Sequence, residues 1–214
     1  MVRLLLAAPN AERTISELAR RARASYAYAH GVVSQLEDRG FLTHLGKRRG
    51  FVVRDPRGLL QAWIDAKEPA FGTREGFYAP RTQPESLKAA VERLRQTDPS
   101  LRMAFTYGSG LLDSERFVSG LPHGIYCNAS LESLMDAFGL KRQTPVNFFV
   151  LRPHPAADVE HGGVFDSPRM LPQGPGVTVP QLVVDLSELP NRGREQAREL
   201  MAHWIDSLPL SNLE

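Results

Sequence analysis

The sequence predicts an α+β protein, with a winged helix-turn-helix at the N-terminus followed by a mixed α/β C-terminal domain. Two short amphipathic helices and a basic hairpin follow one another between Thr14 and Arg54. Beyond Pro84, helix and strand patterns alternate. Residues 1–68 contain twelve Lys and Arg against seven Asp and Glu, whereas residues 69–214 contain fourteen against seventeen. Only the first part therefore has the charge that suits a polyanion.

The N-terminal helices are predicted from apolar spacing and capping residues. The apolar run Met1 to Ala8 is short and is followed at once by a polar segment, so we interpret it as a first helix rather than a signal peptide. Thr14 is expected to cap a second helix, Ile15 to Ala22, and Glu17 stands at the position of a capping box.

A third helix is expected to read DNA. Ser25 can cap it and Gly40 can end it. Its apolar residues share one face: Ala29, Val32, Val33 and Leu36. The other positions carry small or hydrogen-bonding side chains, which can approach base edges closely. The predicted base-reading residues are Ser25, Tyr26, Ala27, Tyr28, His30, Gly31 and Ser34.

A basic hairpin follows as the predicted wing. Its strands are expected at Phe41 to Leu45 and at Phe51 to Arg54. The turn between them carries three cations that would lie beside phosphates: Lys47, Arg48 and Arg49. The alternative is that the same helices and hairpin mediate protein contacts alone.

The predicted domain boundary lies where charge and composition change. A helix that begins after Asp55 and Pro56 and ends near Lys67 closes a DNA-binding domain of residues 1–68. Residues 69–84 are rich in Pro and Gly but contain three aromatic residues, so they are expected to be a packed linker. Residues 85–214 form the predicted mixed α/β domain.

This second domain shows alternating elements in the sequence. The expected elements are helix Glu85 to Gln96, strand Leu101 to Tyr107, strand Gly124 to Cys127, helix Leu131 to Phe138, strand Val146 to Arg152, a loop with one hairpin from His154 to Thr178, an apolar segment Gln181 to Leu186, and helix Arg194 to Leu208.

No catalytic centre is expected. The turn Tyr107 to Gly110 has the Gly-Ser form found in nucleotidyltransferases, but Asp113 and Glu115 follow it too soon to lie on the neighbouring strand and bind magnesium. Neither a cofactor nor a metal site is predicted. The single cysteine, Cys127, forms no disulfide within the chain, which fits a cytoplasmic protein, and no membrane span is expected.

The chain resembles the AbiEi-like antitoxins of type IV toxin-antitoxin systems. An N-terminal stretch, Thr14 to Ala19 together with Leu36 to Phe41, has a pattern shared by many winged helix families. A more specific signature is Leu182 to Leu186 followed by Pro190 to Ala197, with its Asp-Leu, Arg-Gly and Glu-Gln-Ala sequences. The strand and turn Phe105 to Leu111 also resemble a family element, with one Tyr inserted.

This resemblance implies a DNA-binding transcriptional regulator that represses its own operon and counteracts a nucleotidyltransferase toxin. Double-stranded operator DNA is the expected partner, bound by a homodimer on an inverted repeat. The resemblance does not imply a stable complex with the toxin. Two alternatives remain: a one-component regulator whose C-terminal domain binds a small ligand, and a nucleotidyltransferase-like enzyme with a DNA-binding head.

Overall fold

The protein is a mixed α+β structure, seen in a computed structural model that describes residues 1–46, 50–67, 70–154, 163–166 and 168–209. The N-terminal elements are α1 (Val2–Ala7), α2 (Ile15–Arg21), α3 (Tyr26–Asp38), β1 (Leu42–His44), β2 (Phe51–Val53) and α4 (Pro56–Ala66). They are followed by β3 (Phe71–Phe77), α5 (Pro84–Thr97), β4 (Met103–Tyr107), η1 (Gly108–Gly110), η2 (Asp113–Glu115) and β5 (His123–Cys127). The last elements are α6 (Leu131–Phe138), β6 (Phe148–Pro153), β7 (Arg169–Leu171), β8 (Gly174–Gly176), α7 (Val179–Ser187) and α8 (Arg192–Ser207).

The first helices begin where their sequence predicts, because the capping side chains make the expected bonds. The Thr14 hydroxyl accepts the amide of Glu17 at 3.1 Å. The Glu17 carboxylate pairs with Arg13 at 3.5 Å. After α3, Gly40 adopts a φ of +77°, which suits glycine and ends the helix. Asp55 caps α4 by accepting the amide of Gly58 at 2.8 Å, with a proline in the first turn.

A six-stranded sheet forms the centre of the rest of the chain. Its strand order is β3-β6-β5-β4-β8-β7. The pairs β5–β6 and β4–β8 are parallel, and the other neighbours are antiparallel. The segment 69–84, expected as a packed linker, contains β3, which is hydrogen-bonded to β6. The hairpin expected between His154 and Thr178 is β7–β8.

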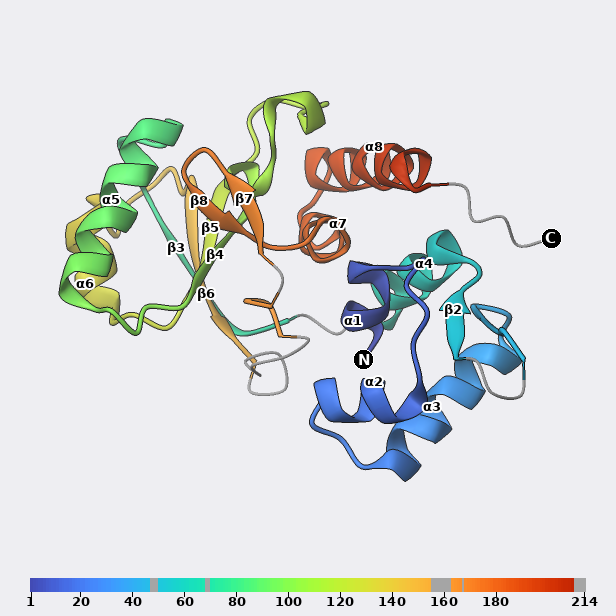
Figure 1. Cartoon of the computed structure of the whole chain (residues 1–214). Coiled ribbons are helices and arrows are strands. Elements are labelled where there is room, and N and C mark those ends of the chain that lie inside the picture. Colours follow the sequence, from blue (N-terminus) through green and yellow to red (C-terminus); the bar gives the residue numbers. More distant parts are fainter. Residues whose placement is uncertain (47–49, 68–69, 155–162, 167, 210–214) are drawn as a thin grey trace.

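Helices cover both faces of this sheet. Helices α5 and α6 lie on one side, and α7 and α8 lie on the other (Figure 1). The apolar segment Gln181 to Leu186 lies within α7. Phe105 of β4 packs in the cluster with α5 and α6, whereas the adjacent Ala104 packs in the cluster with α7 and α8. This alternation is what a strand buried on both faces requires.

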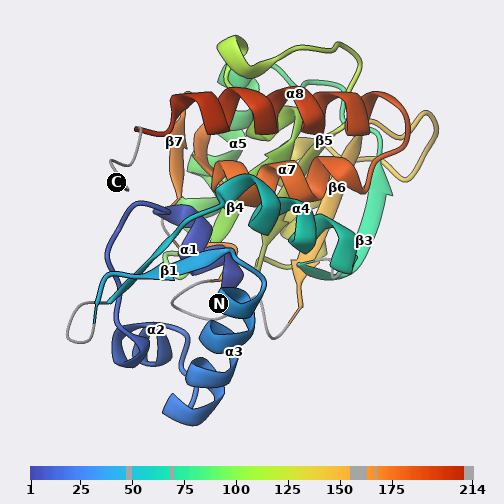
Figure 2. The same cartoon turned by 90° about the vertical axis from the view of Figure 1, so that its right-hand side faces the viewer.

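The N-terminal elements share one apolar core with α7 and α8. Leu4, Leu5 and Leu6 of α1 are at most 2% exposed and belong to the same cluster as Leu182 and Trp204. Helices α1 and α4 lie next to α7, while α2 and α3 lie farther from the sheet (Figures 1 and 2). The predicted boundary near residue 68 therefore separates two segments whose side chains are packed together.

Candidate nucleic-acid interface

Helix α3 presents an exposed face at the end of the molecule remote from the sheet (Figure 1). Its first residue is fixed because the Ser25 hydroxyl accepts the amide of Tyr28 at 3.2 Å. Its buried residues are Ala29, Val33 and Leu36; Val32, expected to share that face, is partly exposed. Six of the seven predicted base-reading residues are exposed: Ser25, Tyr26, Ala27, Tyr28, His30 and Gly31. The seventh, Ser34, is half-buried.

Gly31 lies in the middle of this exposed helix without an internal reason for being glycine. A Cβ added at Gly31 would meet no atom within 4 Å, and the residue has ordinary helical backbone. Glycine within a helix costs about 0.5–1 kcal/mol relative to alanine. Packing within the described chain therefore does not account for Gly31, whereas close approach of an external partner would.

Large polar rings flank this glycine. Tyr26 is 57% exposed and Tyr28 is 63% exposed, which is unusual for aromatic residues. The Tyr26 and His30 rings lie 6.2 Å apart. Since Ala27 and Gly31 are separated by four residues, they lie on the same helix face with the larger side chains beside them. The helix surface therefore has small residues at its centre, with aromatic side chains beside them that can hydrogen-bond or stack.

The hairpin is attached to the segment that precedes α2. Arg13 and Phe51 form a backbone bridge, with hydrogen bonds of 3.0 and 2.8 Å. A Cβ on Gly50 would lie 1.9 Å from the carbonyl oxygen of Arg13, so only glycine permits this approach. Glu12 also accepts the Gly50 amide at 3.0 Å. The base of the hairpin is thus held beside α2, although Lys47, Arg48 and Arg49 lie outside the described residues.

Other cations are exposed around α3 and the hairpin: Arg20, Arg23, Arg39, Arg54 and Arg57. Glu37, on α3, is 3.0 Å from the imidazole of His44. Asp38 is exposed at the end of α3. Arg13 is almost fully buried and so is not available to a phosphate. These five exposed cations are part of the charge surplus of residues 1–68.

A buried polar network crosses the contact between α1 and α7, and it was missed from the sequence. The Asp185 carboxylate accepts hydrogen bonds from the hydroxyls of Thr106 at 2.6 Å and Tyr126 at 2.9 Å. It also accepts the side-chain amide of Gln181 at 2.7 Å. The oxygen of that amide accepts Nε of Arg3 at 2.7 Å. One carboxylate thus connects the sheet and α7 with α1.

Burial is the largest cause of the pKa shifts in this network. It raises the pKa of Asp185 to about 6, although the hydrogen bonds from Thr106, Gln181 and Tyr126 act in the opposite direction. Burial also raises the pKa of Tyr126 well above its usual value and lowers that of Arg3. The ionised form of Asp185 is therefore less stable in the folded protein than in water.

The free energy of unfolding is expected to depend on pH through Asp185. Its pKa rises from 3.8 to about 6 on folding, so its stabilising contribution is complete below pH 3.8 and is lost as the pH rises through 6. Two pKa units correspond to about 3 kcal/mol. Urea unfolding between pH 4 and 7 should show a smaller decline for Asp185→Asn than for the unchanged protein. Asp136→Asn, at an exposed position of α6, is the control. Equal declines for Asp185→Asn and the unchanged protein would contradict the prediction.

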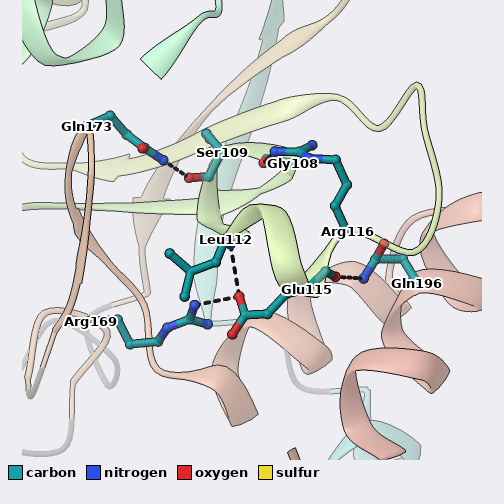
Figure 3. Close-up of polar contacts among 8 residues, drawn as sticks. All are labelled: Gly108, Ser109, Leu112, Glu115, Arg116, Arg169, Gln173 and Gln196. Carbon is teal, nitrogen blue, oxygen red and sulfur yellow. Dashed lines mark hydrogen bonds and ion pairs between the residues drawn. The ribbon is translucent and has the colours of Figure 1, made fainter. Parts of the chain in front are cut away.

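The Gly-Ser turn after β4 is occupied by contacts within the fold. The Ser109 hydroxyl accepts the amide of Gly124 at 3.0 Å and lies 2.8 Å from its carbonyl oxygen. Glu115 pairs with Arg169 at 2.6 Å and accepts the Leu112 amide at 2.9 Å (Figure 3). The Ser109 hydroxyl and the Glu115 carboxylate therefore both have partners within the fold.

Residues of the antitoxin-like signature also have structural contacts. A Cβ on Gly193 would lie 2.2 Å from Cβ of Leu189, so glycine allows the close turn between α7 and α8. Gln196 is fully buried and hydrogen-bonds to three backbone groups, the carbonyl oxygen of Glu115 at the end of η2 and the amides of Phe117 and Val118 just after it. Together with Asp185, these residues fix α7 and α8 against the sheet.

The described ranges contain no group of three or more His, Cys, Asp or Glu side chains placed to hold a metal ion. None of the helices in these ranges combines the length and apolar character needed to cross a bilayer. Comparison with protein-family models, with curated proteins and with solved structures gives no match for this chain. A function for the protein must therefore be inferred from its own residues.

Proposed function

We propose that residues 1–68 form a winged helix-turn-helix that binds double-stranded DNA, with α3 in the major groove. The observation that carries this proposal is the exposed face of α3, where Gly31 is unexplained by internal packing and lies among hydrogen-bonding side chains. The major groove admits an α-helix, and small residues allow the helix backbone to approach base edges. The groove also accommodates the exposed rings of Tyr26 and Tyr28.

The hairpin β1–β2 acts as the wing in this proposal. The base of the hairpin is anchored beside α2, where Gly50 packs against the backbone of Arg13. The surplus of five positive charges in residues 1–68 favours a polyanion over a neutral protein surface. This charge is the feature that favours DNA binding over a module that mediates protein contacts alone.

We further propose that the chain is an antitoxin-type regulator that represses its own operon and counteracts a nucleotidyltransferase toxin. The support is the resemblance in Leu182 to Leu186 and Pro190 to Ala197. A homodimer on an inverted repeat and a cytoplasmic location go with this role. When the chain is co-expressed with a nucleotidyltransferase encoded beside it, it should restore the growth of cells that the enzyme alone arrests. Growth arrest in spite of this chain would count against the antitoxin role.

Replacing Lys47, Arg48 and Arg49 together by Ala is expected to flatten the salt dependence of DNA binding. Removing one phosphate interaction should reduce the slope of log K against log salt by about 0.9, because fewer counterions are released. The slope is measured by fluorescence anisotropy on the duplex upstream of the chain's own reading frame, across a salt series.

The matched control removes three exposed cations from the opposite end of the protein: Lys88, Arg95 and Lys141. It has the same change in net charge, so an equal fall in slope for both triple variants would reflect total charge rather than a wing. An unchanged slope for the Lys47, Arg48 and Arg49 variant would show that the hairpin turn does not contact DNA.

A further inference from the structure

A cavity lies where the N-terminal segment meets the second part of the chain. Its walls come from the end of α4, the end of α7 and from α8, three helices that pack side by side (Figures 1 and 2). Its volume is about 550 Å³. Sites for small molecules usually measure about 300–1,000 Å³ and occur preferentially between domains. A ligand in this cavity would contact the proposed DNA-binding segment and the C-terminal segment at once.

Part of the lining is apolar. Ala197 and Met201 of α8 are buried, Ile64 of α4 is half-buried, and all three line the cavity. The unbranched thioether of a methionine adapts to ligands of different shape. At roughly 30 Å³ per water molecule, the cavity has room for about 18 non-hydrogen atoms. This surface and this volume suit an organic ligand with a large apolar group rather than an inorganic ion.

Two guanidinium groups line the same cavity. Arg194 and Arg198 are exposed and stand four residues apart on α8, so their side chains are neighbours on one face of the helix. Neither side chain forms a hydrogen bond or an ion pair with any residue that the structure describes. A guanidinium has five N–H donors in a planar fork, which matches the two oxygens of a carboxylate. The pair is therefore available to an anionic group on a ligand.

The cavity also contains negative charge that is not paired with these cations. Glu188, which follows the last turn of α7, is exposed, and its carboxylate has no hydrogen-bond or ion-pair partner within the described ranges. The second carboxylate, that of Asp65, already accepts the side-chain amide of Gln61 at 2.9 Å. Free groups of both signs thus line one cavity, and a ligand that carries a cation and an anion can pair with each of them.

The charges and the apolar surface select the class of ligand. The described lining residues include three cations and two carboxylates, a net charge of +1, which suits a zwitterion better than the dianion of a nucleotide phosphate. We propose that this cavity binds a free α-amino acid with a large apolar side chain. The carboxylate of the amino acid lies at Arg194 and Arg198, and its ammonium group lies at Glu188. Its side chain packs against Ile64 and Met201.

The test titrates the full chain, without DNA, with L-phenylalanine by isothermal titration calorimetry at constant ionic strength. A saturable heat with a Kd of about 1 mM or below is expected. Three analogues each lack one group: 2-phenylethylamine lacks the carboxylate, 3-phenylpropionate lacks the ammonium group, and glycine lacks the apolar side chain. Each analogue should bind about tenfold more weakly or less tightly still, because it loses a charged hydrogen bond or the burial of its ring.

Two variants assign the charged groups. Arg198→Gln and Glu188→Gln should each weaken the binding of L-phenylalanine by about tenfold. Arg198→Gln should leave the affinity for 2-phenylethylamine unchanged, and Glu188→Gln should leave that for 3-phenylpropionate unchanged, since each analogue lacks the group that the altered residue binds. Arg95→Gln and Glu199→Gln remove the same charges at exposed positions outside the cavity and should leave the Kd of L-phenylalanine unchanged.

Four outcomes would overturn this assignment. The first is the absence of a saturable heat up to about 50 mM L-phenylalanine, a concentration far above a millimolar Kd. The second is a Kd for L-phenylalanine that is the same in Arg198→Gln or Glu188→Gln as in the unchanged protein. The third is an analogue that binds as tightly as L-phenylalanine. The fourth is tighter binding of AMP, which would mean that the cations select a phosphate. Since no DNA is present, none of these results depends on the proposed DNA binding.

Discussion

The protein is expected to unfold in a single transition, whether unfolding is followed at Trp63 or at Trp204. Trp63 lies on α4 in the predicted DNA-binding domain, and Trp204 lies on α8 in the predicted C-terminal domain. Both pack in or against one apolar cluster that runs from α1 through α4 to α7 and α8. The variants Trp63→Phe and Trp204→Phe each retain one tryptophan, and in each variant the midpoint of urea unfolding by fluorescence should coincide with the midpoint of the same variant by far-UV circular dichroism.

Leu5→Ala should shift both signals together. Leu5 is 1% exposed, and truncation of a buried leucine costs about 3 kcal/mol or more. If the segments unfold as one unit, the destabilisation at α1 should lower the midpoint reported by Trp204 as much as that reported by Trp63. Met170→Ala, at a position 77% exposed, is the control and should change stability by less than about 0.5 kcal/mol. Two separate midpoints, or a shift confined to Trp63, would mean that the segments are independent.

The N-terminal helices could be predicted because their signals are local. Thr14, Ser25 and Asp55 each cap a helix through an amide three residues ahead, and Gly40 ends α3 in the left-handed region. Such bonds depend on short spacings, which are visible in a sequence. The exposure of the α3 face follows from the same helical periodicity.

The contact between the two segments could not be predicted, because it depends on residues far apart in the chain. The apolar run Leu4 to Leu6 indicates a buried helix but not its partner, α7. Strand β3 contains two glycines and lacks a regular alternation of apolar and polar residues, and its partners in β6 are 71 to 82 residues farther along the chain. Asp185 stands within an apolar run, which is the one sequence signal for its burial among hydrogen-bond donors.

The candidate sites divide in the same way. Gly31 is visible in the sequence as a glycine within a helix, and the structure adds that nothing within 4 Å requires it. By contrast, Thr106, Tyr126 and Asp185 lie far apart in the sequence, and only the fold brings their side chains together.

Gly31→Gln is expected to stabilise the protein and to weaken its binding to DNA. Replacing glycine within a helix should raise the free energy of unfolding by about 0.5–1 kcal/mol, because the added side chain meets open space. In the proposed complex the same side chain would stand between the helix backbone and the bases. A decrease of about tenfold or more in affinity is expected, since contacts to a base edge are worth about 1–3 kcal/mol. Urea unfolding measures the first effect, and anisotropy on the duplex upstream of the reading frame measures the second.

The opposite directions of these two effects separate a binding role from a folding role. A variant that loses DNA affinity because it is misfolded would also lose stability, whereas Gly31→Gln should gain it. Ala66→Gln places the same side chain at an exposed position of α4 and should leave the affinity unchanged. A Gly31→Gln protein that is more stable and binds the duplex as tightly as before would show that α3 does not lie in the groove, because no close approach at this residue could then be required.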